Sequence, residues 1–316
     1  MRPPRLGVTL GDPRGIGPEV AAAAFRALGT DGPAHLVAIG PPELLGDLPA
    51  GVEAEPAGGW SGGGDREAGA AAGAAIEHGI RLALDGRLDG LVTAPISKAA
   101  LAAAGYPFPG HTEFLRERTG ADDVTMVMAA ETTPLGGPLR VALVTVHVPL
   151  REVPGRLSVE LVARRAAIAA RGLRDWWGIA RPRLAFAGVN PHASEGGLFG
   201  DEEERVLTPA MRRLEEEMPG VEASGPFPAD TVFRRCLAGE ADAVVVPYHD
   251  VGLAVLKTLA PETGINVTTG LPFPRTSPDH GTAFDIAGRG RADPRSMREA
   301  VEACARFCAR LAGDGT

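Results

Sequence analysis

Short apolar runs alternate along the chain with longer segments in which Ala, Leu and Arg recur at helical spacing. Apolar runs of about four to eight residues bounded by turns are typical of strands buried on both faces, and the segments between them are typical of crossover helices. The pattern predicts an α/β fold. The expected strands are residues 6–10, 36–39, 91–94, 124–129, 140–147, 183–189, 243–247 and 265–268. The expected helices are residues 18–28, 66–85, 97–103, 112–118, 158–171, 202–218, 230–237 and 296–311.

Two segments interrupt this alternation. Residues 58–64 are mostly glycine and carry no ligating or titratable side chain, so we interpret them as a flexible surface loop. Residues 271–278 contain three prolines, follow an expected strand and include Arg275. Because prolines stiffen a loop and loops at strand ends often hold ligands, we expect residues 271–278 to form a ligand-binding loop.

Composition narrows the class of protein. The 316 residues suffice for about two domains, and 44% apolar residues allow a buried core. Lys and Arg number 32 against 40 Asp and Glu, a net charge of −8 without a basic cluster, which disfavours a nucleic-acid partner. The three cysteines suggest neither a disulfide framework nor a cysteine-rich zinc site. Since no signal peptide or long apolar run is evident, we expect a soluble cytoplasmic protein with no membrane partner.

Five of the seven histidines stand at the end of an apolar run or in a turn flanked by Gly or Pro. His147, His192 and His249 each follow an expected strand, and strand ends are where α/β sheets bind ligands. Three neutral imidazoles suit a divalent transition metal, with Asp230 and Asp250 available to orient the rings. Taken singly, each histidine also fits a hydrogen-bonded interior residue.

A second group of residues suggests an anion site. His111 and Thr112 stand at an expected helix start, where free N–H groups favour anions. Lys257 ends an apolar run, and Arg275 lies in the proline-rich segment; these would supply a point charge and a bidentate fork. Phosphate on a small substrate is the obvious ligand. The opening segment GDPRGIGPEV matches neither a dinucleotide fingerprint nor a P-loop, and it is either a structural turn or a wall of a binding site.

Seven motifs in order resemble the 4-hydroxythreonine-4-phosphate dehydrogenases of pyridoxal phosphate biosynthesis: GDPRGIGPE, TAPISK, GHTEFL, NPHASEGGLFG, PADT, YHDVGLAVLK and GINVTTGLPFPRTSPDHGTAFDIAG. The opening loop and DHGTAFDIAGRGRADP also resemble isocitrate and isopropylmalate dehydrogenases, which bind NAD(P) without a Rossmann fold. The resemblance implies two α/β/α domains with a cleft between them, residues 1–123 plus 281–316 and residues 124–280. Ser97, Val251 and Ala254 depart from residues frequent in the family.

The resemblance also implies ligands and their residues. One divalent metal per subunit (Zn, Mg, Co or Mn) would be held by His147, His192 and His249 across a homodimer interface. The phosphorylated substrate would contact His111, Thr112, Lys257, Asn266 and Arg275. NAD or NADP would bind near Asp279, His280, Gly281, Thr282 and Asp285. Candidates for the general base are Asp230, Asp250 and Lys257.

The activity implied is metal- and NAD(P)-dependent oxidation of the C3 hydroxyl of 4-phosphohydroxy-L-threonine. The β-keto acid would then decarboxylate to 3-amino-2-oxopropyl phosphate. Paralogues oxidise D-threonate or D-erythronate 4-phosphate in sugar-acid catabolism, and others aromatise a cis-dihydrodiol of terephthalate. The alternative from another functional class is a protein that binds the metal and a phosphorylated metabolite without catalysing a reaction.

Overall fold

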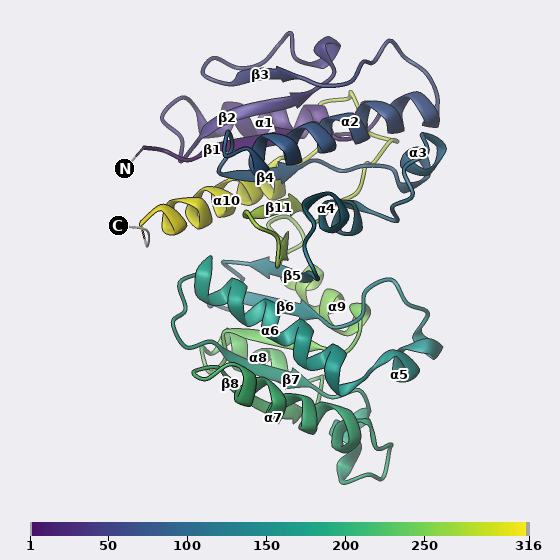
Figure 1. Ribbon diagram of the computed structural model, residues 1–316, viewed down its shortest axis with the longest axis vertical. Coiled ribbons are helices and arrows are strands. Elements are labelled where there is room, and N and C mark those ends of the chain that lie inside the picture. The colour runs from purple at the N-terminus through teal and green to yellow at the C-terminus, as the bar shows by residue number, and fades with distance from the viewer. Residues whose placement is uncertain (1, 314–316) are drawn as a thin grey trace. The chain divides into compact units, whose positions relative to one another are not determined.

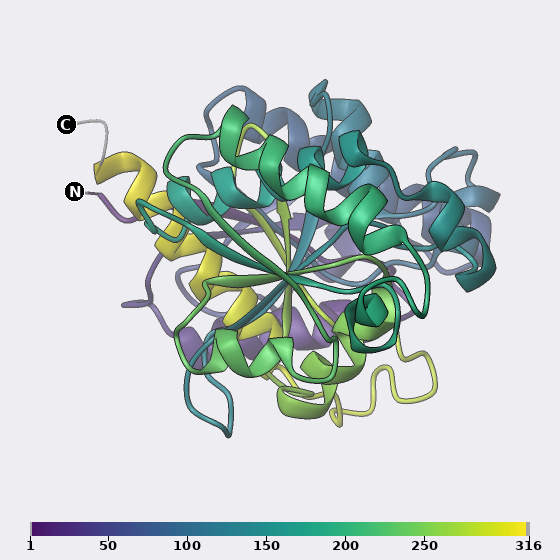
Figure 2. The ribbon, with the colours of Figure 1, turned by 90° about the horizontal axis from the view of Figure 1, so that it is seen from below.

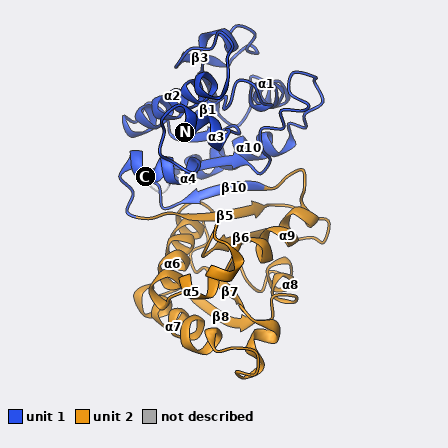
Figure 3. Cartoon of the chain, turned by 90° about the vertical axis from the view of Figure 1, so that its right-hand side faces the viewer, with its two compact units in different colours: residues 1–122, 265–316 blue, residues 123–264 orange. Residues whose placement is uncertain are grey.

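The structure is a computed structural model that describes residues 2–313. It divides into two compact units, one formed by residues up to Asp122 together with those from Ile265 onward, and the other by Asp123–Gly264 (Figure 3). Residues 265–280, which we had expected in the second domain, thus belong to unit 1. The reason is that the strand at Arg275–Pro278 pairs with Gly90–Thr93, in the middle of the unit 1 sheet.

Unit 1 contains a sheet with helices on both faces (Figures 1 and 2). The strand order is β3-β2-β1-β4-β11-β10, parallel except for the antiparallel pair β10 and β11. Helix α2 covers one face, and α1 and α10 cover the other. The strands are β1 Arg5–Thr9, β2 His35–Gly40, β3 Glu53–Pro56, β4 Gly90–Thr93, β10 Ile265–Thr269 and β11 Arg275–Pro278. The helices are α1 Gly17–Leu28, α2 Asp65–Leu84, α3 Lys98–Ala103, α4 His111–Thr119 and α10 Arg295–Gly313, with a 3₁₀ turn at Pro42–Leu44.

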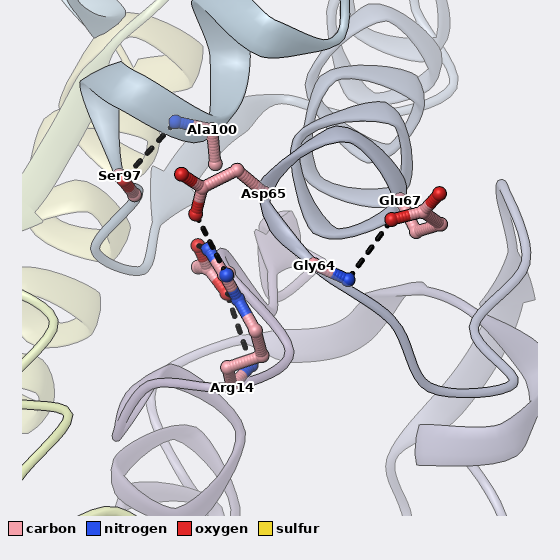
Figure 4. A network of polar contacts seen from close by, with 7 residues as sticks. Arg14, Gly64, Asp65, Glu67, Ser97 and Ala100 are labelled. Carbon is pink, nitrogen blue, oxygen red and sulfur yellow. Dashed lines mark hydrogen bonds and ion pairs between the residues drawn. The ribbon is translucent and has the colours of Figure 1, made fainter.

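Small residues let the helices of unit 1 approach closely. A Cβ at Gly69 of α2 would lie 1.9 Å from the carbonyl oxygen of Ala100 in α3, so only glycine permits this packing. Helix α3 starts at an N-cap, where the Ser97 hydroxyl accepts the N–H of Ala100 at 3.2 Å (Figure 4).

Unit 2 is a second sheet with α6 and α7 on one face and α8 and α9 on the other (Figures 1 and 3). Its strand order is β5-β6-β9-β7-β8, parallel except for the pair β5 and β6. The strands are β5 Thr125–Ala130, β6 Leu139–Leu143, β7 Arg183–Ala187, β8 Glu222–Phe227 and β9 Ala243–Val246. The helices are α5 Val153–Arg156, α6 Val159–Asp175, α7 Thr208–Glu217, α8 Val232–Leu237 and α9 His249–Leu259. Short 3₁₀ turns lie at Leu150–Glu152 and Pro191–Glu195, and a π-helical turn lies at Glu203–Leu207.

The α/β prediction is confirmed, and every expected strand and helix overlaps an observed one. One expectation needs correction: the expected ligand loop 271–278 ends in strand β11, which is buried between β4 and β10. Two strand pairs are antiparallel, because each is joined by a short connection. His249 follows strand β9, as expected, and opens helix α9. Among the residues described, no helix is both long and apolar enough to cross a membrane.

Candidate active-site residues

Two of the expected metal ligands, His147 and His249, lie together beyond the carboxyl ends of neighbouring strands of the unit 2 sheet. Strands β6 and β9 are parallel neighbours, and beyond their ends the N–H of Thr145 still donates to the carbonyl of Pro247 at 3.2 Å. This pairing brings the segments that follow both strands side by side. The centroids of the two imidazole rings are 5.9 Å apart. A metal about 2.1 Å from one nitrogen of each ring fits between rings at this separation.

The His249 ring is oriented by its neighbour in the chain. His249 is the first residue of α9, and its Nδ1 lies 2.7 Å from Oδ1 of Asp250. In the tautomer that donates from Nδ1 to this carboxylate, Nε2 keeps its lone pair for a metal. The two histidines line a hollow formed by residues 146–150, 153 and 248–250. Leu150 at its rim is 67% exposed.

His192 lies on a separate turn of unit 2. It follows β7 in the turn Pro191–Glu195, and its Nδ1 is 3.1 Å from Oε2 of Glu195. The edge of the Phe199 ring faces the imidazole, with centroids 6.2 Å apart. Within residues 2–313, no three His, Cys, Asp or Glu side chains of the chain are grouped as a metal site. One chain therefore brings two of the three expected ligands together.

The expected bases of unit 2 lie apart from each other along the chain. Asp250 is bonded to His249, as described above. Lys257 is on the last turn of α9, about 12 Å along the helix axis from His249 at a rise of 1.5 Å per residue. Asp230 is exposed in the turn that precedes α8. Asp250 thus contacts an expected metal ligand directly.

Arg275 in unit 1 is a buried cation, and among the residues described no carboxylate forms an ion pair with it; the charge of Glu113 acts on it only from a distance. It is the first residue of β11 and is 1% exposed. Its Nη1 donates to the Thr268 hydroxyl at 2.8 Å and its Nη2 to the Thr93 hydroxyl at 2.5 Å, while Nε has no acceptor. Burial lowers the pKa of Arg275 to about 9. A guanidinium held by two hydroxyls in this way is a ready site for an anion, which would offset its desolvation.

Other polar groups of unit 1 lie near this guanidinium. Burial first, and the charge of Arg275 second, hold the pKa of His111 well below its usual value. His111 begins α4, so it stands where free backbone N–H groups meet an anion, and Thr112 follows it. The Nε2 of His111 and the Oδ1 of Asn266 are both buried without a hydrogen-bond partner. Asn266 is in β10, which pairs with β11, so the sheet carries it close to Arg275.

The opening segment of unit 1 is held by a network of ion pairs (Figure 4). Asp12 is fully buried and accepts three hydrogen bonds from Arg14, from its N–H at 3.0 Å, Nε at 3.1 Å and Nη2 at 2.9 Å. Nη1 of Arg14 donates to Asp65 at 2.7 Å, at the start of α2. The hydrogen bonds to Asp12 raise the pKa of Arg14, which stays charged. These contacts favour the interpretation of this segment as a structural turn over that of a binding-site wall.

The residues expected to bind the nucleotide follow β11 in unit 1. The N–H of Ile16 donates to the carbonyl of Thr282 at 2.9 Å, and the N–H of Asp279 donates to the Ser296 hydroxyl at 3.1 Å. The first bond holds this segment to the opening loop, and the second holds it to the start of α10. The expected residues are half-exposed or exposed: Asp279, His280, Gly281, Thr282 and Asp285.

Comparison with known proteins identifies the family. The family model described as "Pyridoxal phosphate biosynthetic protein PdxA" matches residues 51–304. The chain belongs to the PdxA family. A protein named 4-hydroxythreonine-4-phosphate dehydrogenase from Desulfosudis oleivorans is 42% identical, with 95% of this chain and 94% of that protein covered. The resemblance seen in the motifs is thus confirmed over almost the whole length.

Solved structures agree with this assignment. The crystal structure of 4-hydroxythreonine-4-phosphate dehydrogenase from Klebsiella pneumoniae is similar with a TM-score of 0.84 and 37% identity, covering 97% of this chain and 98% of that one. A terephthalate 1,2-cis-dihydrodiol dehydrogenase from Burkholderia xenovorans is more distant, with a TM-score of 0.67, 27% identity and coverage of 96% and 98%. This PdxA chain is therefore more similar to a dehydrogenase named for a phosphorylated substrate.

Proposed function

We propose that the protein oxidises the C3 hydroxyl of 4-phosphohydroxy-L-threonine with NAD or NADP, in the presence of a divalent metal. The product, a β-keto acid, loses carbon dioxide to give 3-amino-2-oxopropyl phosphate. The observation that carries the proposal is Arg275, whose buried guanidinium has no carboxylate partner and lies near His111 at a helix start. Such a site suits a phosphate better than a neutral group.

Each set of residues has a part in this proposal. Arg275, His111, Thr112, Asn266 and Lys257 bind the phosphate and position the substrate. His147 and His249 offer two nitrogens to one metal, and His192 offers a third. When bound, the metal would polarise the substrate hydroxyl, and the nicotinamide would take up hydride.

Proton transfer and nucleotide binding use further residues of the chain. Because Asp250 is engaged with His249, it orients that ring, and Lys257 or Asp230 removes the hydroxyl proton. The segment from Asp279 to Asp285 would hold the nucleotide. Its backbone is bonded to the opening loop at Thr282, and Gly281 and Asp285 are exposed, which fits that task.

We propose that two copies of the chain form a homodimer and that His192 completes the metal site of its partner. Leu198 and Phe199, seven residues or fewer after His192, are 72% and 45% exposed. Leu150, at the rim of the hollow that holds His147 and His249, is 67% exposed. Contact between copies would remove these apolar side chains from water.

Turnover tests the proposed reaction. Purified protein with Zn²⁺, Mg²⁺, Co²⁺ or Mn²⁺ is given NAD⁺ or NADP⁺ and one of three substrates, 4-phosphohydroxy-L-threonine or the 4-phosphates of D-threonate and D-erythronate. We expect reduced nicotinamide, followed by its absorbance, with the highest kcat/KM for the first substrate. A higher kcat/KM for either sugar-acid 4-phosphate would instead indicate a dehydrogenase of sugar-acid catabolism. Binding of metal and substrate without reduction would leave a non-catalytic binding protein.

Removing a ligand tests the metal site. His249→Ala should lose bound metal and activity and keep its fold, since the ring is one of three nitrogen ligands. His35→Ala, which removes an exposed imidazole at the start of β2, is the matched control. Metal content by plasma mass spectrometry is measured for both. Full occupancy in His249→Ala would remove this residue from the ligand set.

Mixing inactive variants tests the shared site. If His192 acts in the partner's site, His192→Ala and His249→Ala subunits form mixed dimers with one intact site. Random exchange then restores up to about a quarter of wild-type activity. Mixing His147→Ala with His249→Ala is the control and should restore none, because these two rings lie in one chain. No recovery in the first mixture after demonstrated exchange would contradict the shared site.

A further inference from the structure

Glu203 is a buried carboxylate that faces the turn carrying His192. It is 4% exposed, and every hydrogen bond that it accepts comes from a neutral donor. Its Oε1 accepts the N–H groups of Val189 and Asn190, each at 2.7 Å. Its Oε2 accepts the side-chain amide of Asn190 at 2.9 Å and the hydroxyl of Ser194. Both oxygens are therefore used to hold residues on either side of His192.

The turn that Glu203 holds has an unfavourable backbone. His192, Ala193, Ser194 and Glu195 have φ values of 54°, 51°, 68° and 45°. The left-handed region costs an L-residue roughly 1–2 kcal/mol, so four in succession need support from their surroundings. Within the turn the N–H of Ala193 donates to the carbonyl of Asn190 at 3.1 Å, and the N–H groups of Gly197 and Phe199 donate to the carbonyl of Ser194.

The end of β7 is shaped to admit both the turn and the carboxylate. A Cβ at Gly188 would lie 3.0 Å from the Cα of Ala193 and 3.1 Å from Oε1 of Glu203. Only a glycine lets the two approach this closely without displacement. Gly188 itself is held by its N–H, which donates to the carbonyl of Phe227 at 2.8 Å.

A π-helical turn brings Glu203 to this place. Residues Glu203–Leu207 form the wider turn before α7, and such turns inside helices are frequent at functional sites. Glu202 also contacts the Asn190 side-chain amide, with its Oε2 at 2.7 Å, whereas Glu204 is exposed. Of the four adjacent acidic residues 201–204, Glu203 is thus the buried one, beneath the turn.

We infer that Glu203 is a positioning residue for His192. By binding Asn190 before the histidine and Ser194 after it, Glu203 holds the turn in its left-handed conformation and sets the direction in which the imidazole points. Glu195 then orients the ring through Nδ1, which leaves Nε2 toward a metal. The inference rests on the proposed function in one respect, namely that His192 is a metal ligand.

Metal binding and amide exchange test this role. Glu203→Gln keeps one acceptor oxygen and replaces the other with an NH2 donor opposite the side-chain donors of Asn190 and Ser194, so the hold on the turn is weakened. Affinity for Zn²⁺ or Co²⁺ alone, measured by calorimetry, should fall about 10- to 100-fold. Glu204→Gln removes the same charge from the adjacent exposed residue and should bind as wild type does. Hydrogen exchange without metal should be faster at Val189 and Asn190 in Glu203→Gln only.

A double-mutant cycle separates positioning from general support. If Glu203 acts through His192, His192→Ala and His192→Ala/Glu203→Gln should have the same metal affinity. Additive losses of metal affinity would overturn the inference in favour of a general structural role. Equal metal affinities of Glu203→Gln and Glu204→Gln, with a weaker affinity in His192→Ala, would overturn it too. Unchanged affinity in His192→Ala would instead overturn the ligand assignment of the proposed function.

A milder variant keeps the test valid if Glu203→Gln does not fold. Ser194→Ala removes one donor to the carboxylate and leaves its charge and the other bonds in place. We expect weaker metal affinity with a melting curve close to wild type. The inference would be overturned if Ser194→Ala binds metal as tightly as the wild type and its Asn190 amide exchanges no faster.

Discussion

Two buried arginines, Arg140 in unit 2 and Arg275 in unit 1, differ in how the protein balances their charge. Arg140 is 8% exposed in β6, and its Nη2 donates to Glu131 at 2.7 Å. Trp177 completes the group, since its indole N–H donates to the same carboxylate at 2.7 Å and its ring lies 5.5 Å from the guanidinium. The charge of Arg140 is neutralised inside the protein.

Arg275 is buried more deeply and is bonded to hydroxyls only. Taking a cation out of water is costly unless an opposite charge lies near it. Fold stability alone would therefore favour a pair such as that of Arg140 and Glu131. The contrast supports the proposal that the charge of Arg275 serves an anionic ligand, at some cost to the stability of the protein without ligand.

The largest expected effect on folding is at the paired arginine. Arg140→Met leaves Glu131 without its cation in a partly buried place, so the free energy of unfolding should fall by about 3 kcal/mol. Urea denaturation followed by Trp fluorescence measures the loss, and phosphate affinity should stay as in wild type. A loss of under about 1 kcal/mol would mean that the pair behaves as an exposed ion pair, and the comparison would fail.

At Arg275 we expect the opposite division between stability and binding. Arg275→Met removes a buried charge that has no carboxylate partner, so stability without anion should be equal to wild type or higher. The contact with a phosphorylated substrate should weaken by about 1.5 to 3 kcal/mol, or about 10- to 150-fold in kcat/KM. Thermal melting with and without inorganic phosphate provides the second readout, since phosphate should stabilise only the wild type. Equal kinetic losses on the dephosphorylated substrate would make Arg275 structural.

Elements built on apolar runs could be predicted from the sequence, and those built on polar residues could not. Strand β11 reads Arg-Thr-Ser-Pro, yet all four residues are buried. Internal hydrogen bonds make this possible, as when the hydroxyl of Thr276 donates to the carbonyl of Ala300 at 2.7 Å. Strands β3 and β8 carry half-buried or exposed side chains at the edges of their units, so no apolar run marks them. Helix α9 was read only as an apolar run that leads to Lys257.

The candidate site divides in a similar way. His147, His249 and Arg275 could be named because each residue type has a chemistry and each follows or opens a strand. Their surroundings could not be named: the hydroxyls of Thr93 and Thr268 meet Arg275 from two other strands. Glu203 stands in a run of four acidic residues, and only the π-helical turn shows that this one is buried. Long-range packing decides such partners, and residue types alone do not record it.

The smallest expected effect is a pH dependence at His111. Burial and the nearby charge of Arg275 hold its pKa well below the usual value, so below about pH 6.5 the unfolded chain binds a proton that the folded protein does not. This group therefore lowers stability as pH falls from 6.5, by at most about 1.4 kcal/mol per pH unit. His111→Gln should flatten the change in melting temperature between pH 7.5 and 5.5 (about one unit on either side of the usual value), while His35→Gln, at an exposed position, should not.

Bound anion should weaken the same dependence in the wild type. A phosphate near Arg275 offsets the positive charge that disfavours a protonated His111, so the pKa of His111 rises toward its usual value. Melting curves at pH 7.5 and 5.5, each with and without inorganic phosphate, measure this change. We expect the loss of stability on acidification to be smaller with phosphate in the wild type and unaltered by it in Arg275→Met. Equal losses with and without phosphate in the wild type would place the anion away from His111 and break the link between the unpaired arginine and the start of α4.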